Sequence, residues 1–206
     1  MPDLLKICGL RDNFAEVVAA TKPDLAGLIF YPPSPRHVHT PPPYPVSDTR
    51  RVGVFVSHRL PEMRTIAKDF DLHGIQLHGD QDTDTADALR ADGLLVIKAI
   101  RVQAASDIAQ AQAWQGHCDY LLFDAHGKRY GGNGIRFDWD LLRHYTGETP
   151  FFLSGGIGPD DAPALRAFVH PAYVGIDINS GFEEAPAKKS VSSIQYFLQQ
   201  LKANAR

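Results

Sequence analysis

The stretches LLKICG (residues 4–9) and YLLFDAHG (residues 120–127) each join an apolar run to a reactive side chain and a nearby glycine. Two later stretches, FFLSGGI (residues 151–157) and YVGIDINSG (residues 173–181), run directly into glycine and serine. Apolar runs of this length are typical of buried parallel strands. Because a parallel barrel gathers the carboxyl ends of its strands at one mouth, we expect a thiol, carboxyl groups and glycine-rich turns to meet there.

Eight such runs alternate with segments of helical composition, which predicts an α/β fold, a single-domain (β/α)8 barrel. The second connection is an exception, because residues 31–45 are rich in proline and favour a long front loop over a regular helix. The expected strands are 4–10, 25–30, 52–56, 74–77, 94–100, 120–123, 151–153 and 173–178. The expected helices are 12–21, 61–70, 83–91, 105–114, 138–145, 160–169 and 188–205.

Length and charge restrict the class of protein. The 206 residues are at the short end for such a barrel, and one catalytic domain over residues 1–206 is the economical interpretation. A net charge of -3 without a long basic run argues against nucleic-acid or membrane partners. No apolar run reaches the ~18 residues of a membrane span, and the start lacks a signal-peptide pattern, so a cytoplasmic location is expected.

Strand alternation predicts which side chains share the barrel interior, because every second residue of a strand points to the same side. The pairs expected on one side of their strands are Lys6 with Cys8, Gln76 with His78, Leu122 with Asp124, and Gly175 with Asp177.

Cys8 and Asp124 are the candidate proton-transfer groups. A lone cysteine is commonly a small buried hydrophobe, but Cys8 stands before Gly9 at the expected mouth. A free thiol has a pKa of about 8.5, so catalysis would need an activating environment. Asp124 is a helix cap, a surface carboxylate, or an acid whose pKa is raised by burial, and we favour the last. Cys118 precedes its strand and is interpreted as core packing; both thiols are expected to be reduced.

The turns after the last two strands indicate a phosphate site. Glycine allows backbone N–H groups to approach an anion closely, so Gly155, Gly156, Ser180 and Gly181 are predicted to bind phosphate. The segment 131–134, GGNG, is either a turn or a mobile lid.

Three other polar residues have open roles. Arg36, in a proline-restricted loop, is either solvated or aimed into the mouth to bind a carboxylate. The hydrogen bond of His78 either serves the binding pocket or has a purely structural role. Asp177 either organises the pocket or transfers a proton. No metal site is predicted, because the other histidines are scattered: His37, His39, His58, His73, His117, His126, His144 and His170.

Taken in order, these motifs closely resemble the phosphoribosylanthranilate isomerase family of tryptophan biosynthesis, over nearly the whole chain. They are KICG (6–9), SPR (34–36), QLHG (76–79), Asp124, SGG (154–156) and GID (175–177) followed by Ser180 and Gly181. Asn179 replaces a serine common in the family, and Asn133 a threonine.

The resemblance implies an Amadori rearrangement of N-(5-phosphoribosyl)anthranilate to 1-(2-carboxyphenylamino)-1-deoxyribulose 5-phosphate. Asp124 would be the general acid and Cys8, as thiolate, the general base. Arg36 would hold the anthranilate carboxylate, His78 and Asp177 would help to bind the substrate, and the late turns would hold phosphate. The family needs no cofactor, and a monomer or homodimer is expected.

Other functions on the same fold remain alternatives. A sugar-phosphate lyase or aldolase would need a Schiff-base lysine, for which Lys98 is the candidate. A catalytically silent phosphosugar-binding protein would not need Cys8 and Asp124 together. A broad-specificity isomerase that also serves histidine biosynthesis is a further alternative. The cysteine base and the compact single-domain length favour the dedicated tryptophan enzyme over it.

Overall fold

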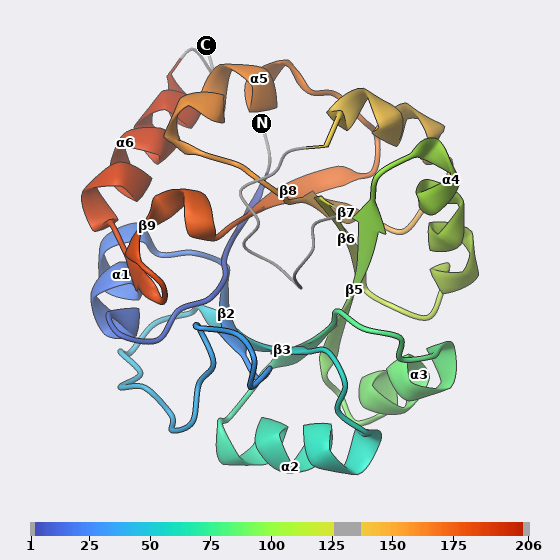
Figure 1. Cartoon of the computed structure of the whole chain (residues 1–206), viewed down its shortest axis with the longest axis horizontal. Helices are drawn as coiled ribbons and strands as arrows, with labels where there is room; N and C mark the ends of the chain where they lie inside the picture. Colours follow the sequence, from blue (N-terminus) through green and yellow to red (C-terminus); the bar gives the residue numbers. More distant parts are fainter. Residues whose placement is uncertain (1–2, 126–136, 204–206) are drawn as a thin grey trace.

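Eight parallel strands close into a barrel in chain order, with β8 hydrogen-bonded back to β1. The computed structural model describes residues 3–125 and 137–203, and Figure 1 shows the helices arranged around the outside of the strands. All eight expected strands are present, which confirms the predicted (β/α)8 fold. They are β1 (Leu4–Ile7), β2 (Leu25–Ile29), β3 (Arg50–Phe55), β4 (Gly74–Leu77), β5 (Leu95–Val102), β6 (Tyr120–Ala125), β7 (Phe151–Leu153) and β8 (Tyr173–Ile178).

The interior of the barrel is divided between apolar and polar side chains. Its lower part is a cluster that includes Leu25, Ile97, Leu122 and Phe152, all fully buried. Two residues further along β6, on the same side of the strand, lies Asp124. Asp124 at the end of β6 therefore faces the same side of the strand as Leu122, as strand alternation predicts.

Between the strands, the outer layer contains α-helices and several 3₁₀ segments. The α-helices are α1 (Phe14–Thr21), α2 (Leu60–Asp69), α3 (Thr83–Ala91), α4 (Ala105–Ile108), α5 (Ala162–Ala167) and α6 (Val191–Lys202). The 3₁₀ helices are η1 (Ala109–Trp114), η2 (Trp139–His144), η3 (Pro159–Asp161) and η4 (Ser180–Phe182). No helix lies between β2 and β3, so the expected front loop is confirmed.

Two predicted α-helices are largely 3₁₀ instead. In 138–145 the buried residues are Trp139, Leu142 and Tyr145, at a spacing of three. A 3₁₀ helix has three residues per turn and places such a set on one face. The segment 105–114, which forms α4 and η1, has the same spacing at Ile108, Ala111 and Trp114.

The predicted helix over 188–205 begins later than expected. A hairpin of β9 (Glu183–Ala185) and β10 (Lys188–Lys189) precedes α6. Its turn places Ala187 at φ 71°, in the left-handed region that few residues other than glycine adopt. In Figure 1 this hairpin lies close to α1 and to the start of α6.

Candidate active site

A buried ion pair joins the first and last strands at the mouth. Lys6 on β1 is in register with Asp177 on β8, and Lys6 Nζ lies 2.9 Å from Asp177 Oδ1. The Lys6 side chain is completely buried. Burial lowers the pKa of Lys6, but Asp177 and Cys8 outweigh this effect, so the pKa is raised and the lysine is an ammonium ion.

The Cys8 thiol lies beside this pair. Its backbone N–H donates to Ile178 O, which ties the end of β1 to β8. Gly27 on β2 leaves room for the side chain, because a Cβ there would come within 2.8 Å of Cys8 Sγ. Burial raises the pKa of the thiol, and the charge of Asp177 raises it further. The positive charges of Lys6 and Lys189 lower it, but the net pKa stays above its ordinary value. Two cations thus favour the thiolate against the effect of burial.

Asp124 lies in the same mouth as a carboxyl group that is hard to ionise. Burial raises its pKa to about 7, and the negative charge of Asp177 adds to this effect. The N–H of Ala125 donates to Asp124 Oδ1 at 2.9 Å and opposes the shift. A carboxyl group with this pKa is about half protonated near neutral pH and can donate a proton.

His78 faces Asp124 as a neutral imidazole. Burial lowers the pKa of His78 to about 3, with further lowering by Lys6. His78 Nε2 lies 3.5 Å from Asp124 Oδ2, and Gln76 Nε2 lies 3.2 Å from His78 Nδ1. An amide N–H donated to Nδ1 leaves the ring proton on Nε2, which faces the carboxyl group.

The turns after β7 and β8 lie against each other. Gly155 and Gly156 adopt φ values of 83° and 68°, in the left-handed region. A Cβ on Gly181 would come within 2.2 Å of Ile157 O, so the η4 turn packs directly on the β7 turn. Ser154 Oγ donates to Asp177 Oδ2 at 3.3 Å and thereby links this region to the ion pair. The four residues predicted to bind phosphate therefore flank one side of the mouth.

Arg36 reaches the mouth from the front loop but is already paired. Its Nε and Nη2 donate to the two carboxylate oxygens of Glu183, at 2.8 and 2.6 Å. A Cβ on Gly9 would come within 2.7 Å of Arg36 Cδ, so the arginine stem lies over the turn after Cys8. The guanidinium is buried, and one of its two donor edges is occupied.

Sequence reasoning assigned no role to three charged residues of this site. A structural role for Lys6 could have been inferred, because a lysine that points into the barrel needs a buried counter-ion. Closure of the barrel places Asp177 on the neighbouring strand β8. Glu183 and Lys189 gave no comparable signal, since they lie in a hairpin that was not predicted. Segment 131–134, interpreted as a turn or a lid, lies outside the described residues.

Lys98 and Cys118 lie away from the mouth. Lys98 Nζ donates to Gly79 O at 2.6 Å and lies 4.6 Å from the centre of the Trp114 ring, on the outer side of β5. The Cys118 thiol lies near Trp114 O, and burial raises its pKa to about 12.

In residues 3–125 and 137–203, no set of three His, Cys, Asp or Glu side chains is arranged to hold a metal ion. None of the helices in the same ranges has the length and apolar character needed to span a bilayer.

A closed (β/α)8 barrel whose mouth collects a thiol, an ammonium group and carboxyl groups is the architecture of an enzyme that moves protons. The family model described as "N-(5'phosphoribosyl)anthranilate (PRA) isomerase" matches residues 5–200. The chain belongs to this family of tryptophan biosynthesis and is an isomerase.

Relatives of known sequence and structure agree with this assignment. An N-(5'-phosphoribosyl)anthranilate isomerase from Phocaeicola vulgatus is 40% identical over 200 residues, covering 97% of this chain and 98% of the relative. The crystal structure of the Thermus thermophilus phosphoribosyl anthranilate isomerase superposes with a TM-score of 0.82 at 25% identity, covering 97% and 98% of the two chains. A second crystal structure, of phosphoribosyl anthranilate isomerase in complex with reduced 1-(o-carboxyphenylamino)-1-deoxyribulose 5-phosphate, has a TM-score of 0.77 at 28% identity, covering 97% of this chain and 98% of that one.

Proposed function

We propose that this isomerase converts N-(5-phosphoribosyl)anthranilate to 1-(2-carboxyphenylamino)-1-deoxyribulose 5-phosphate, with Asp124 as general acid and Cys8 as general base. One observation carries this proposal. The mouth holds the buried Asp124 carboxyl group together with the buried Cys8 thiol beside the Lys6 ammonium, and burial raises the pKa of Asp124 to about 7. The rearrangement requires an acid that begins protonated and a base that can become an anion, and the cations near Cys8 oppose the effect of burial on its thiol.

The steps conserve atoms and charge. Asp124 donates its proton to the ribose ring oxygen, and the C1′–O bond breaks to leave a Schiff base. The Cys8 thiolate removes the proton from C2′, which gives an enolamine. This tautomerises to the ketone as C1′ gains a proton and the C2′ hydroxyl loses one, and the thiol of Cys8 gives up its proton while the carboxylate of Asp124 regains one. Burial, together with the charge of Asp177, favours the protonated form of Asp124, and the ammonium of Lys6 favours the thiolate against the effect of burial.

Binding would use both ends of the substrate. The backbone N–H groups around Gly155, Gly156 and Gly181 would hold the phosphate with help from Ser180, while Arg36 would hold the anthranilate carboxylate. His78 would donate a hydrogen bond beside Asp124. We also propose that residues 1–206 form one catalytic domain, since a single closed barrel contains all of these groups.

The activity test uses freshly generated phosphoribosylanthranilate and follows the loss of anthranilate-type fluorescence. We expect the purified protein to accelerate this loss well above the spontaneous rate. A rate equal to the background would refute the proposed reaction.

Arg36→Met should raise KM strongly and lower kcat less. Methionine keeps much of the apolar stem but lacks the donors that hold a carboxylate. Arg36→Lys should restore only part of the loss, because a point charge cannot reproduce a two-point contact. Steady-state kinetics measure both constants, and an unchanged KM in Arg36→Met would place the carboxylate elsewhere.

Lys6→Met should shift the pH dependence of Cys8 alkylation upward by about 1–3 pH units, the range expected for losing an opposite charge. The cause is the loss of the ammonium that lowers the thiol pKa. Iodoacetamide labelling of Cys8 across pH, followed by mass spectrometry, measures the midpoint. Lys98→Met is the matched control, since it removes another buried lysine on the outer side of the barrel. Identical midpoints in the folded Lys6→Met variant and the wild type would exclude this role for Lys6.

A further inference from the structure

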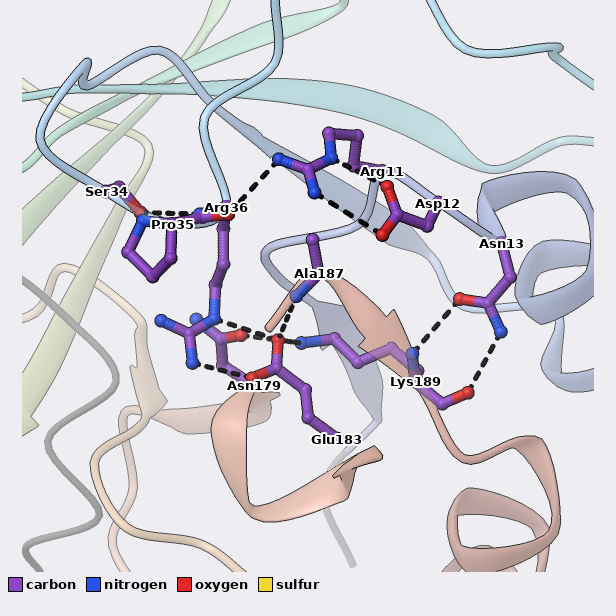
Figure 2. A network of polar contacts seen from close by, with 10 residues as sticks. All are labelled: Arg11, Asp12, Asn13, Ser34, Pro35, Arg36, Asn179, Glu183, Ala187 and Lys189. Carbon is purple, nitrogen blue, oxygen red and sulfur yellow. Dashed lines mark hydrogen bonds and ion pairs between the residues drawn. The ribbon is translucent and has the colours of Figure 1, made fainter. Parts of the chain in front are cut away.

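Glu183 is a buried carboxylate between two cations. Its side chain is 6% exposed, and it lies between Arg36 from the front loop and Lys189 from β10. Figure 2 shows the two cationic side chains approaching Glu183 from opposite sides. Lys189 Nζ lies 2.7 Å from Glu183 Oε1 and also donates to Asn179 Oδ1 at 2.6 Å.

Both oxygens of Glu183 accept charge-assisted hydrogen bonds. Oε1 accepts from Arg36 Nε, from Lys189 Nζ and from the backbone N–H of Ala187, and Oε2 accepts from Arg36 Nη2. Burial alone would raise the pKa of Glu183, but Arg36 and Lys189 outweigh it and lower the pKa. Glu183 is therefore a fixed negative charge at neutral pH.

The backbones that carry these two cations are fixed as well (Figure 2). Arg11 Nη1 donates to Pro35 O and to His37 O, on either side of Arg36. The side-chain amide of Asn13 accepts from the Lys189 N–H and donates to the Lys189 carbonyl. The guanidinium of Arg36 thus has a defined position before any ligand arrives.

This arrangement determines what Arg36 can offer to a ligand. Glu183 uses the edge formed by Nε and Nη2, so the edge formed by Nη1 and Nη2 is the one available for a second carboxylate. Two cations and one carboxylate carry a net charge of +1. One ligand carboxylate would neutralise the cluster.

We propose that Glu183 is a positioning residue that sets the selectivity of the enzyme for a ring carboxylate, by holding Arg36 with one donor edge toward the ligand. This inference rests on the proposed role of Arg36. Because Glu183 holds both guanidinium donors on one edge of Arg36, its effect should appear in recognition of the carboxylate end of the substrate.

The test compares two ligands by calorimetry. One is reduced 1-(o-carboxyphenylamino)-1-deoxyribulose 5-phosphate, and the other is the same compound without the ring carboxylate. Glutamine keeps the shape of Glu183, but its NH2 group would face a donor of Arg36, so one contact must be lost. In Glu183→Gln we expect about tenfold weaker binding of the carboxylate-bearing ligand, the equivalent of one charge-assisted hydrogen bond. Binding of the other ligand should change by less than about twofold, because that ligand has no carboxylate for Arg36 to hold.

Glu184→Gln is the matched control, because the neighbouring Glu184 pairs with Lys188 at the surface. This variant should bind both ligands as the wild type does. Equal weakening of both ligands in Glu183→Gln, or tighter binding of the carboxylate-bearing ligand, would overturn the positioning role. If Glu183→Gln fails to fold, Glu183→Asp replaces it, with a smaller loss expected for the same ligand alone.

Arg36→Met separates this inference from the proposed function. If Arg36→Met abolishes the preference for the carboxylate while Glu183→Gln leaves it intact, Arg36 binds the carboxylate and only the inference about Glu183 is wrong. If Arg36→Met leaves the preference intact, the proposed role of Arg36 fails and the inference fails with it. In the double variant, Glu183→Gln should add nothing to the effect of Arg36→Met.

Discussion

Replacing Cys8 with alanine should lower kcat by roughly 10²–10⁴-fold, the contribution of a positioned general base. The variant should still bind a reduced product analogue, because the contacts proposed for the phosphate and carboxylate do not involve the thiol. The fluorescence assay gives kcat, and calorimetry gives the affinity. Bound analogue should also slow alkylation of Cys8 in the wild-type protein.

Cys118→Ala is the matched control for this prediction. It also removes a buried thiol, but one outside the mouth, so it should keep the wild-type kcat even if stability falls. Cys8→Ser should be nearly as inactive as Cys8→Ala, since a hydroxyl ionises far less readily than a thiol. Near-wild-type turnover in Cys8→Ala would show that another group removes the proton.

Asp124→Asn should also lower kcat by roughly 10²–10⁴-fold, because asparagine cannot donate the proton that opens the ribose ring. The amide occupies the same volume, and the backbone N–H of Ala125 can still be accepted by its oxygen. Binding of the product analogue should therefore persist. The same two measurements distinguish lost chemistry from lost binding.

A second, exposed aspartate provides the comparison for Asp124. Asp140 is 70% exposed and pairs with Arg143, so Asp140→Asn should be fully active. If a folded Asp124→Asn variant turned over at the wild-type rate, the raised pKa of Asp124 would reflect burial alone, and the acid would have to be found elsewhere in the mouth.

The strands and the orientation of their side chains could be predicted from the sequence because both follow from short-range rules. Apolar runs define the strands, and alternation places Cys8 and Asp124 inside. These two features need no knowledge of distant contacts. The register of β1 against β8, which sets Lys6 opposite Asp177, joins the two ends of the chain and does not follow from these rules.

The partner of Arg36 could not be predicted in this way. Glu183 is 147 positions away in the chain, and it reaches Arg36 through a hairpin whose turn uses Ala187 in a conformation that sequence rules assign to glycine. The 3₁₀ segments were missed for a different reason. A spacing of three over so few residues resembles an α-helical pattern until the burial of each residue is known.

The division of the barrel interior has a consequence for how this enzyme could change. The lower apolar cluster around Phe152 supports the fold, whereas Asp124 and its neighbours at the strand ends support the chemistry. Substitutions at the upper level can therefore alter the reaction with little change in the packing below. For directed evolution, the strand ends are the positions to randomise, and the floor of the barrel is the part to leave untouched.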